Sequence, residues 1–236
     1  MPDTDDLTAP IQPLRVTVVT AVTTSHTQAI VDQLRRESLT VDVVLTSVLD
    51  AQPTCPVYVV SLEPALLPDL GPRFVAWAAT SELCAGLIGV VESGSTEANE
   101  DLLAFGFDDV VAAPVSTREL VARVKAVHRR VHWKGISNGR VRFADLVLDL
   151  YGCELWIDGK TIALTSIELA VLRELIKARG KPLSRADLLD RAWGEGDFEV
   201  SERAVDNVLL RLRRKLPAPE RIETVRSVGF RISDRT

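Results

Sequence analysis

Residues 201–216 read SERAVDNVLLRLRRKL, and residues 222–231 read IETVRSVGFR. In the first stretch, apolar residues stand three, four, seven and eleven positions after Val205, which predicts an amphipathic helix that ends before Pro217. The second stretch predicts two short strands joined by a tight turn before Gly229. This pairing of a helix with a terminal hairpin determines how the C-terminal part of the chain is interpreted.

Two further helices are predicted immediately before this stretch. Thr165 to Glu168 has the spacing of a capping box, and the helix that it opens ends near Arg179, before Gly180 and Pro182. A second helix is predicted from Ser184 to about Trp193. Three helices followed by a hairpin form a winged helix-turn-helix. Alternating strands around 141–150 and 154–164, with a hairpin turn at Asp158-Gly159, precede them.

The polar face of the third helix has the chemistry needed to read the major groove of DNA. Arginine can bond a guanine edge through two hydrogen bonds, asparagine can do the same with adenine, and further arginines can hold phosphates. A solvated helix face alone would show the same residues, but the hairpin beside it favours DNA. Residues 203–235 hold nine basic and four acidic side chains, although the whole chain has a net charge of −5. The face comprises Arg203, Asn207, Leu210, Arg211 and Arg214.

The N-terminal part predicts a second domain of α/β class. Five short valine-rich runs alternate with helical segments, which is typical of a doubly wound parallel sheet buried on both faces. The predicted strands are 16–21, 41–45, 57–61, 87–91 and 109–112, and the helices are 26–37, 73–80, 97–105 and 117–131. The predicted domain plan is a disordered tail (1–13), the α/β domain (14–130), a linker (131–140) and the winged helix domain (141–236).

Composition excludes several classes of protein. With 46% apolar and 26% charged residues, the chain is neither largely disordered nor a membrane protein, since no apolar run reaches the length of a spanning helix. The first thirteen residues contain three aspartates and no basic residue, unlike a signal peptide. Cys55, Cys84 and Cys153 have no metal-ligand spacing and are expected to be buried, reduced thiols in a cytoplasmic protein. No catalytic set, metal site or cofactor motif is found, so we expect no enzyme.

Residues 141–233 resemble the DNA-binding domain of OmpR/PhoB-type response regulators. The resemblance is carried by LTSIEL at 164–169, LSRADLLDRAWG at 183–194, RAVDN at 203–207, LRRKL at 212–216 and the hairpin at 222–231. It implies a four-stranded antiparallel sheet before the helices, Asp206 to Arg214 in the major groove, and Arg226 in the minor groove. It also implies that Arg203, Arg213 and Thr224 bind phosphates and that the protein binds direct repeats. Ala204 stands where the family often has Thr or Ser.

The N-terminal domain is similar to a receiver, the domain that usually precedes this module. The clearest match is FGFDDVVAAP at 105–114, but the residues for aspartyl phosphorylation are replaced. Mg²⁺ binding needs carboxylate oxygens, and without the metal or a lysine nothing would neutralise a phosphoryl group. The sequence therefore predicts a pseudo-receiver that acts without phosphorylation. The replaced positions are Thr20 and Ala21 (acidic pair), Ser61 (phosphoacceptor), Val91 (Thr or Ser) and Ala113 (lysine).

The resemblance also implies a symmetric homodimer of the receiver-like domains. Asp109 and Arg123 match positions that pair across that interface, Glu119 adds a charge, and Leu102, Val110, Val121 and Val124 add apolar contact. The acidic loop 194–200 matches the segment that faces RNA polymerase in activators of the family.

Three functions remain open at this point. The first is a sequence-specific DNA-binding regulator with a phosphorylation-independent receiver. The second is a conventional phosphorylated response regulator. The third is a ligand-sensing α/β domain fused to a DNA-binding module.

Overall fold

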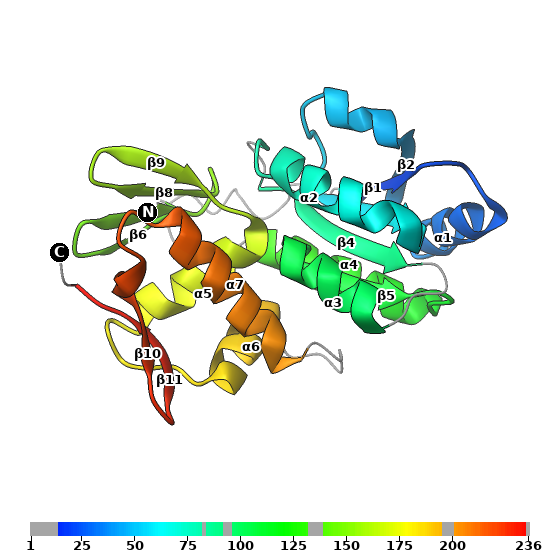
Figure 1. Cartoon of the computed structure of the whole chain (residues 1–236). Coiled ribbons are helices and arrows are strands. Elements are labelled where there is room, and N and C mark those ends of the chain that lie inside the picture. Colours follow the sequence, from blue (N-terminus) through cyan, green and yellow to red (C-terminus); the bar gives the residue numbers. More distant parts are fainter. Residues whose placement is uncertain (1–13, 82–83, 92–95, 132–138, 195–200, 235–236) are drawn as a thin grey trace, which may run out of the picture.

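The computed structural model describes residues 14–81, 84–91, 96–131, 139–194 and 201–234, and it shows two domains side by side (Figure 1). The predicted tail, most of the predicted linker and most of the predicted polymerase-facing loop lie outside the described residues. Within the described residues, no helix combines the length and the apolar character needed to cross a membrane.

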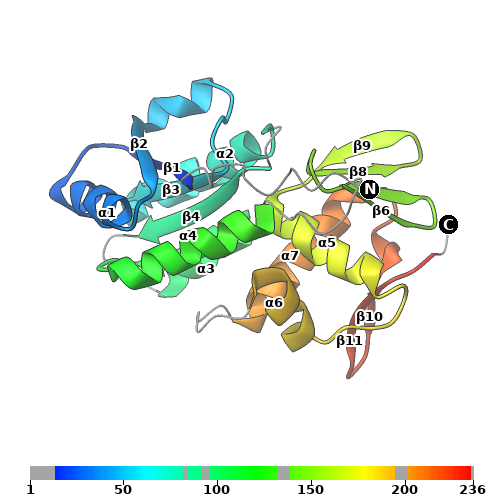
Figure 2. The ribbon, with the colours of Figure 1, turned by 180° about the vertical axis from the view of Figure 1, so that it is seen from behind.

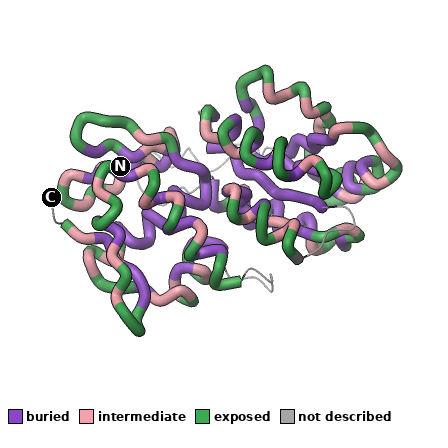
Figure 3. The backbone as a smooth tube through the Cα atoms, viewed as in Figure 1, coloured by how far each residue is buried: buried purple, intermediate pink, exposed green. Residues whose placement is uncertain are grey.

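The N-terminal domain is the predicted doubly wound parallel sheet. Its five strands lie in the order β2-β1-β3-β4-β5, and every neighbouring pair is parallel. The strands are β1 (Arg15–Thr20), β2 (Thr40–Leu45), β3 (Val57–Leu62), β4 (Gly86–Val91) and β5 (Asp109–Ala112). All residues of β3 and β4 are buried, as expected for central strands covered on both faces. Figure 3 shows this buried layer between more exposed helices.

Helices cover the two faces of this sheet in pairs. Contacts pair α1 with α4 and α2 with α3, and the buried side chains of the two pairs belong to different hydrophobic clusters. The bounds are α1 (Ser25–Arg36), α2 (Leu67–Ala78), α3 (Thr96–Phe105) and α4 (Thr117–Val131). Helix α2 begins six residues before the predicted start at Arg73. Pro68 lies in the first turn, where a proline lacks only an N–H that has no partner there, whereas Pro72 lies inside the helix.

The C-terminal domain is a winged helix domain preceded by a four-stranded antiparallel sheet in the order β6-β7-β8-β9. The alternating segments around 141–150 and 154–164 are each a hairpin. The first turns at Ala144-Asp145, where Ala144 has positive φ, and the second turns at the predicted Asp158-Gly159, where both residues have positive φ. The remaining bounds are β6 (Arg140–Phe143), β7 (Leu146–Asp149), β8 (Glu154–Ile157), β9 (Lys160–Ala163), α5 (Ser166–Lys177), α6 (Arg185–Trp193), α7 (Glu202–Lys215), β10 (Ile222–Val225) and β11 (Gly229–Ile232).

The capping box predicted at the start of α5 is present, and the predicted start of α6 at Ser184 has a second one. Thr165 accepts from the backbone N–H of Glu168, and Ser184 accepts from that of Asp187, each with the reciprocal side-chain bond. These caps fix where α5 and α6 begin. They thereby set the platform on which α7 packs.

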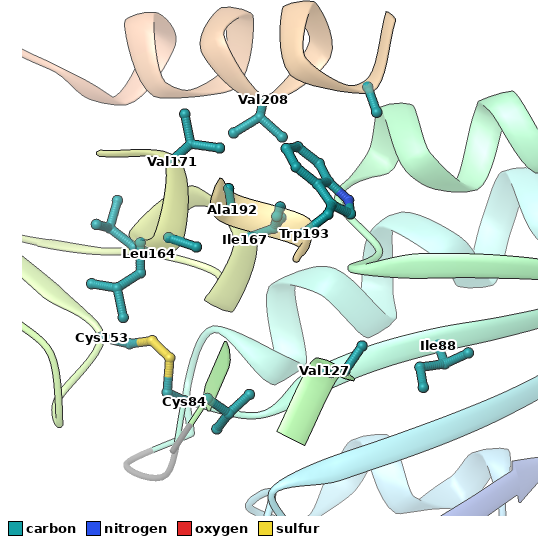
Figure 4. Packing of buried hydrophobic residues seen from close by; sticks show 14 of the residues in the cluster. Cys84, Ile88, Val127, Cys153, Leu164, Ile167, Val171, Ala192, Trp193 and Val208 are labelled. Carbon is teal, nitrogen blue, oxygen red and sulfur yellow. A yellow bond between two sulfur atoms is a disulfide. The ribbon is translucent and has the colours of Figure 1, made fainter. Parts of the chain in front are cut away.

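The two domains share one hydrophobic core. A single cluster of buried side chains runs from Val16 in β1 to Ile232 in β11. At the boundary, Val127 of α4 and Ile88 of β4 lie near Ile167 of α5 and Trp193 of α6 (Figure 4). The reverse view shows the end of α4 against the helices of the winged domain (Figure 2).

Candidate nucleic-acid interface

Helix α7 and the hairpin β10–β11 form the candidate interface. The predicted apolar face of α7 is buried, with Val205, Leu209 and Leu212 fully enclosed against α5 and α6. This packing leaves the arginine-bearing face of α7 turned away from the core of its own domain. The hairpin lies beside the helices because Phe230 and Leu183 exchange two backbone hydrogen bonds of 2.8 Å.

Three predicted DNA-contacting side chains are exposed on this surface. Arg214 near the end of α7 and Arg226 at the hairpin tip make no hydrogen bond or ion pair with the described residues. Leu210 is 46% exposed beside them, which is unusual for a leucine on a packed helix. Two exposed cations and one apolar side chain on one helix–hairpin surface are suited to contact with a polyanion.

Arg213 joins the helix to the hairpin. Its guanidinium donates to the backbone oxygen of Ile222 at 2.7 and 3.0 Å and to the hydroxyl of Thr224 at 2.9 Å. Both residues were predicted to bind phosphates. In this structure they bind each other, and the pair orients the hairpin relative to α7.

Arg211 turns away from solvent in this conformation, although the sequence placed it on the open face. Its Nε donates to the carboxylate of Glu168 at 3.2 Å, and its Nη1 donates to the backbone oxygens of Leu103 and Ala104 in α3, each at 2.9 Å. The side chain is 13% exposed, and burial lowers the pKa of its guanidinium. A predicted base-reading residue is therefore held by the receiver-like domain.

The beginning of α7 faces the same helix of the receiver-like domain. Arg203 forms an exposed ion pair of 3.4 Å with Glu100 of α3. Asn207 and Asp206 line a cleft of about 270 Å³ between α3 and α7, together with Glu100 and Asp101. Asp206 is also bonded to Arg185 at 3.0 Å. In this conformation α3 lies against the face of α7 that carries Asn207 and Arg211.

A buried polar cluster fixes the domains behind this contact. Arg130 of α4 donates to the backbone oxygen of Ala192 at 2.9 Å and lies 3.4 Å from the carboxylate of Asp108. Asp108 in turn accepts from the hydroxyl of Ser166 in α5 and from the N–H of Leu87. Burial raises the pKa of the Asp108 carboxyl and lowers that of the Arg130 guanidinium. No local pattern indicated this cluster, because its members come from both domains.

A disulfide also joins the two domains, between Cys84 before β4 and Cys153 before β8 (Figure 4). The expectation that all three cysteines are reduced thiols is therefore wrong for these two, while Cys55 is free and buried as expected. The two cysteines are 69 positions apart in the sequence, and only the fold brings their Cα atoms to 5.3 Å.

The positions at which the sequence predicts replaced phosphorylation residues lie at the carboxyl ends of the parallel strands. Thr20 and Ser61 stand opposite each other in the β1–β3 register. Thr20 donates to the backbone oxygen of Val22, whereas the Ser61 hydroxyl is buried without a partner in the described structure. Val91 ends β4 and Ala113 follows β5. Among the described residues, no group of three or more His, Cys, Asp or Glu side chains could hold a metal ion.

The residues predicted at a dimer interface are mostly engaged within one chain. Arg123 pairs with Asp109 at 2.8 Å and with Glu119 at 2.9 Å, and the first of these pairs is buried. The side chains of Leu102, Val121 and Val124 are also buried in the core, whereas Val110 and Glu119 are partly exposed. The dimer itself stays a prediction.

Comparison with known proteins agrees with this geometry. Residues 159–232 match the family described as "Transcriptional regulatory protein, C terminal". The chain is 38% identical over 146 residues to the probable transcriptional regulator ycf27 of Guillardia theta, covering 56% of this chain and 58% of that protein. It is 37% identical over 136 residues to the phosphate regulon regulatory protein PhoB of Pseudomonas aeruginosa, with 57% and 58% covered. The chain thus spans less than two thirds of these relatives.

A solved structure covers more of the chain. A RitR mutant superposes with a TM-score of 0.73 at 21% identity, over 94% of this chain and all of that one, which shows that the two share a fold. Fold and surface together define a two-domain protein, a receiver-like domain followed by a winged helix domain. In sequence, its C-terminal domain matches a family of transcriptional regulatory domains, and about half of the chain is similar to a PhoB regulator.

Proposed function

We propose that the chain is a cytoplasmic, sequence-specific DNA-binding transcriptional regulator. The observation that carries the proposal is the row of arginines along α7, continued by Arg226 on the hairpin, on a winged helix domain. The matched family of transcriptional regulatory domains supports it. In this proposal Arg214 and Arg203 hold phosphates, Asn207 and Arg211 read base edges, and Arg226 enters the minor groove.

Replacing Arg214 or Arg226 with alanine should weaken binding to duplex DNA of any sequence, because each removes one cation that neutralises the charge of the DNA. The slope of log affinity against log salt should fall by about one unit for each variant. Fluorescence anisotropy of the dithiothreitol-reduced chain with a mixed-sequence duplex of roughly 30 base pairs, about three turns of the double helix, measures this. Arg142→Ala, a substitution on β6, is the matched control and should keep the wild-type slope. Equal loss in all three variants would contradict the assigned surface.

We further propose that the receiver-like domain acts without aspartyl phosphorylation. The residues at the carboxyl ends of β1 and β3 support this, since Thr20, Ala21 and Ser61 supply neither the paired carboxylates that Mg²⁺ prefers nor an aspartate nucleophile. The pocket residues of a conventional receiver are replaced at Val91 and Ala113 as well.

Incubation with acetyl phosphate and Mg²⁺ should leave the intact mass and the DNA affinity unchanged, and Ser61→Ala should behave like the wild type. Mass spectrometry and the same anisotropy assay check both points. An added mass of one phosphoryl group together with tighter DNA binding would favour a conventional response regulator.

The proposed homodimer uses a surface that α7 covers here. Helix α3, which belongs to the predicted dimer face, contacts α7 through Glu100 and the backbone of Leu103 and Ala104. A symmetric dimer through α3 and the closed arrangement therefore compete for the same helix. We propose that dimerisation and DNA binding both require the domains to separate, with RNA polymerase as a further partner on DNA.

A further inference from the structure

The disulfide between Cys84 and Cys153 is a second covalent connection between the domains. The first is the polypeptide itself, between the end of α4 and the start of β6. Both cysteines are 3% exposed, and both have a left-handed backbone, with φ of 55° and 52°. A residue with a Cβ adopts that conformation only at a cost, so the surrounding structure holds the two cysteines in place.

The polar contacts between α7 and α3 are of a kind that opens easily without a covalent tie. The Arg203–Glu100 pair is exposed, and exposed ion pairs contribute little free energy. Arg211 is bonded to backbone oxygens that water can satisfy equally well after separation. The buried Asp108–Arg130 pair loses to desolvation much of what it gains from attraction. A second tether keeps these weak contacts closed by raising their effective concentration.

We infer that the Cys84–Cys153 disulfide is a redox lock that holds α7 against α3, and that its reduction frees the DNA-facing side chains of α7. The inference rests on the proposed function only for what α7 then binds. The opening of the domains can be measured without DNA. A compartment that holds DNA and soluble regulators keeps thiols reduced, and disulfides formed there are usually transient and sensing.

A dithiol opens the disulfide, and hydrogen peroxide closes it again. A dithiol attacks one sulfur as its thiolate and forms a mixed disulfide, and its second thiolate then displaces the remaining cysteine. Two electrons and two protons pass to Cys84 and Cys153, and the dithiol becomes a cyclic disulfide. In the reverse direction, hydrogen peroxide oxidises one cysteine to a sulfenic acid with loss of water, and the other thiol displaces a second water to close the bridge.

Amide hydrogen exchange of the full chain tests the opening. Alkylation under denaturing conditions, followed by intact mass, first establishes the state: one reactive thiol in the peroxide-treated chain and three after dithiothreitol. Exchange in α3 and α7 should then be at least about tenfold faster in the reduced chain. Cys84→Ser and Cys153→Ser should reproduce the fast exchange without reductant. Cys55→Ser is the matched control and should respond to reductant as the wild type does.

Two results of the alkylation and exchange measurements would overturn the lock. One is three reactive thiols in the peroxide-treated chain, since no bridge would then form. The other is exchange in α3 and α7 that does not change on reduction. Because reduction of the wild type needs no substitution, a serine variant that failed to fold would leave this test intact.

Binding to the mixed-sequence duplex separates the lock from the proposed function. If reduction opens the domains and tightens DNA binding about tenfold, both stand. If the domains open but neither state binds DNA, the lock stands and the proposed function fails. If both states bind DNA with equal affinity, the lock does not control the DNA-facing surface and the inference is wrong.

Discussion

Replacing Gly229 with alanine should disrupt the contact between the hairpin and the helices. We expect the free energy of unfolding to fall by about 3–5 kcal/mol, because overpacking is combined with backbone strain. A Cβ at this position would lie 1.9 Å from the backbone oxygen of Leu183 and 2.8 Å from the Cα of Ser184. Backbone atoms cannot move aside as a flexible side chain does. The residue also has a φ of 151°, a conformation that favours glycine.

Gly159→Ala is the matched control for this prediction. Gly159 has a φ of 71° in the same domain, but no atom lies within 4 Å of the position that a Cβ would take there. Gly159→Ala should therefore lower the free energy of unfolding by only about 1 kcal/mol, from the strained backbone conformation alone. Urea denaturation followed by circular dichroism measures both variants. Similar losses of unfolding free energy in the two variants would mean that the close approach to Leu183 is not what keeps the hairpin against the helices.

Replacing Glu168 with glutamine should lower the free energy of unfolding by about 3–5 kcal/mol, because it leaves the buried guanidinium of Arg211 without its counter-charge. The Glu168 carboxylate is fully buried and accepts from Arg211 at 3.2 Å, from Lys215 at 2.6 Å and from the N–H of Thr165 at 3.0 Å. An amide in its place would present a donor to groups that can only donate. The same variant should also loosen Arg211 from α3.

Glu223→Gln gives the comparison for a partly exposed pair. Glu223 is bonded to Arg231, whose side chain is 42% exposed, and such pairs contribute roughly 0–1 kcal/mol. The midpoint of urea unfolding should thus fall clearly for Glu168→Gln and little for Glu223→Gln, with the same slope in both. Equal midpoints would show that Glu168 does not neutralise Arg211 and Lys215.

Local patterns were sufficient to predict most of the fold. Valine-rich runs predicted all five parallel strands, and the spacing in α7 predicted which of its side chains are buried. Capping residues predicted the starts of α5 and α6, because those bonds form within four neighbouring residues. Each of these signals depends on residues that are close together in the sequence.

Contacts between the domains could not be predicted in that way. Periodicity shows that Arg211 lies off the buried face of α7, but it cannot show that α3 of another domain covers it. The same reason applies to the Asp108–Arg130–Ser166 cluster and to Cys84 with Cys153, which only the tertiary structure brings together. The exposed residues Arg214 and Arg226 were the part of the candidate site that local pattern could assign.

The measurement that tests the central claim most directly is the salt dependence of DNA binding by the reduced full chain and by its Arg214→Ala/Arg226→Ala double variant. If α7 and the hairpin bind DNA, the double variant keeps the wild-type unfolding midpoint while its salt slope falls by about two units, since two cations that neutralise the charge of the DNA are removed. A double variant with the wild-type affinity and slope would contradict the claim that α7 and the hairpin are the surface that binds DNA.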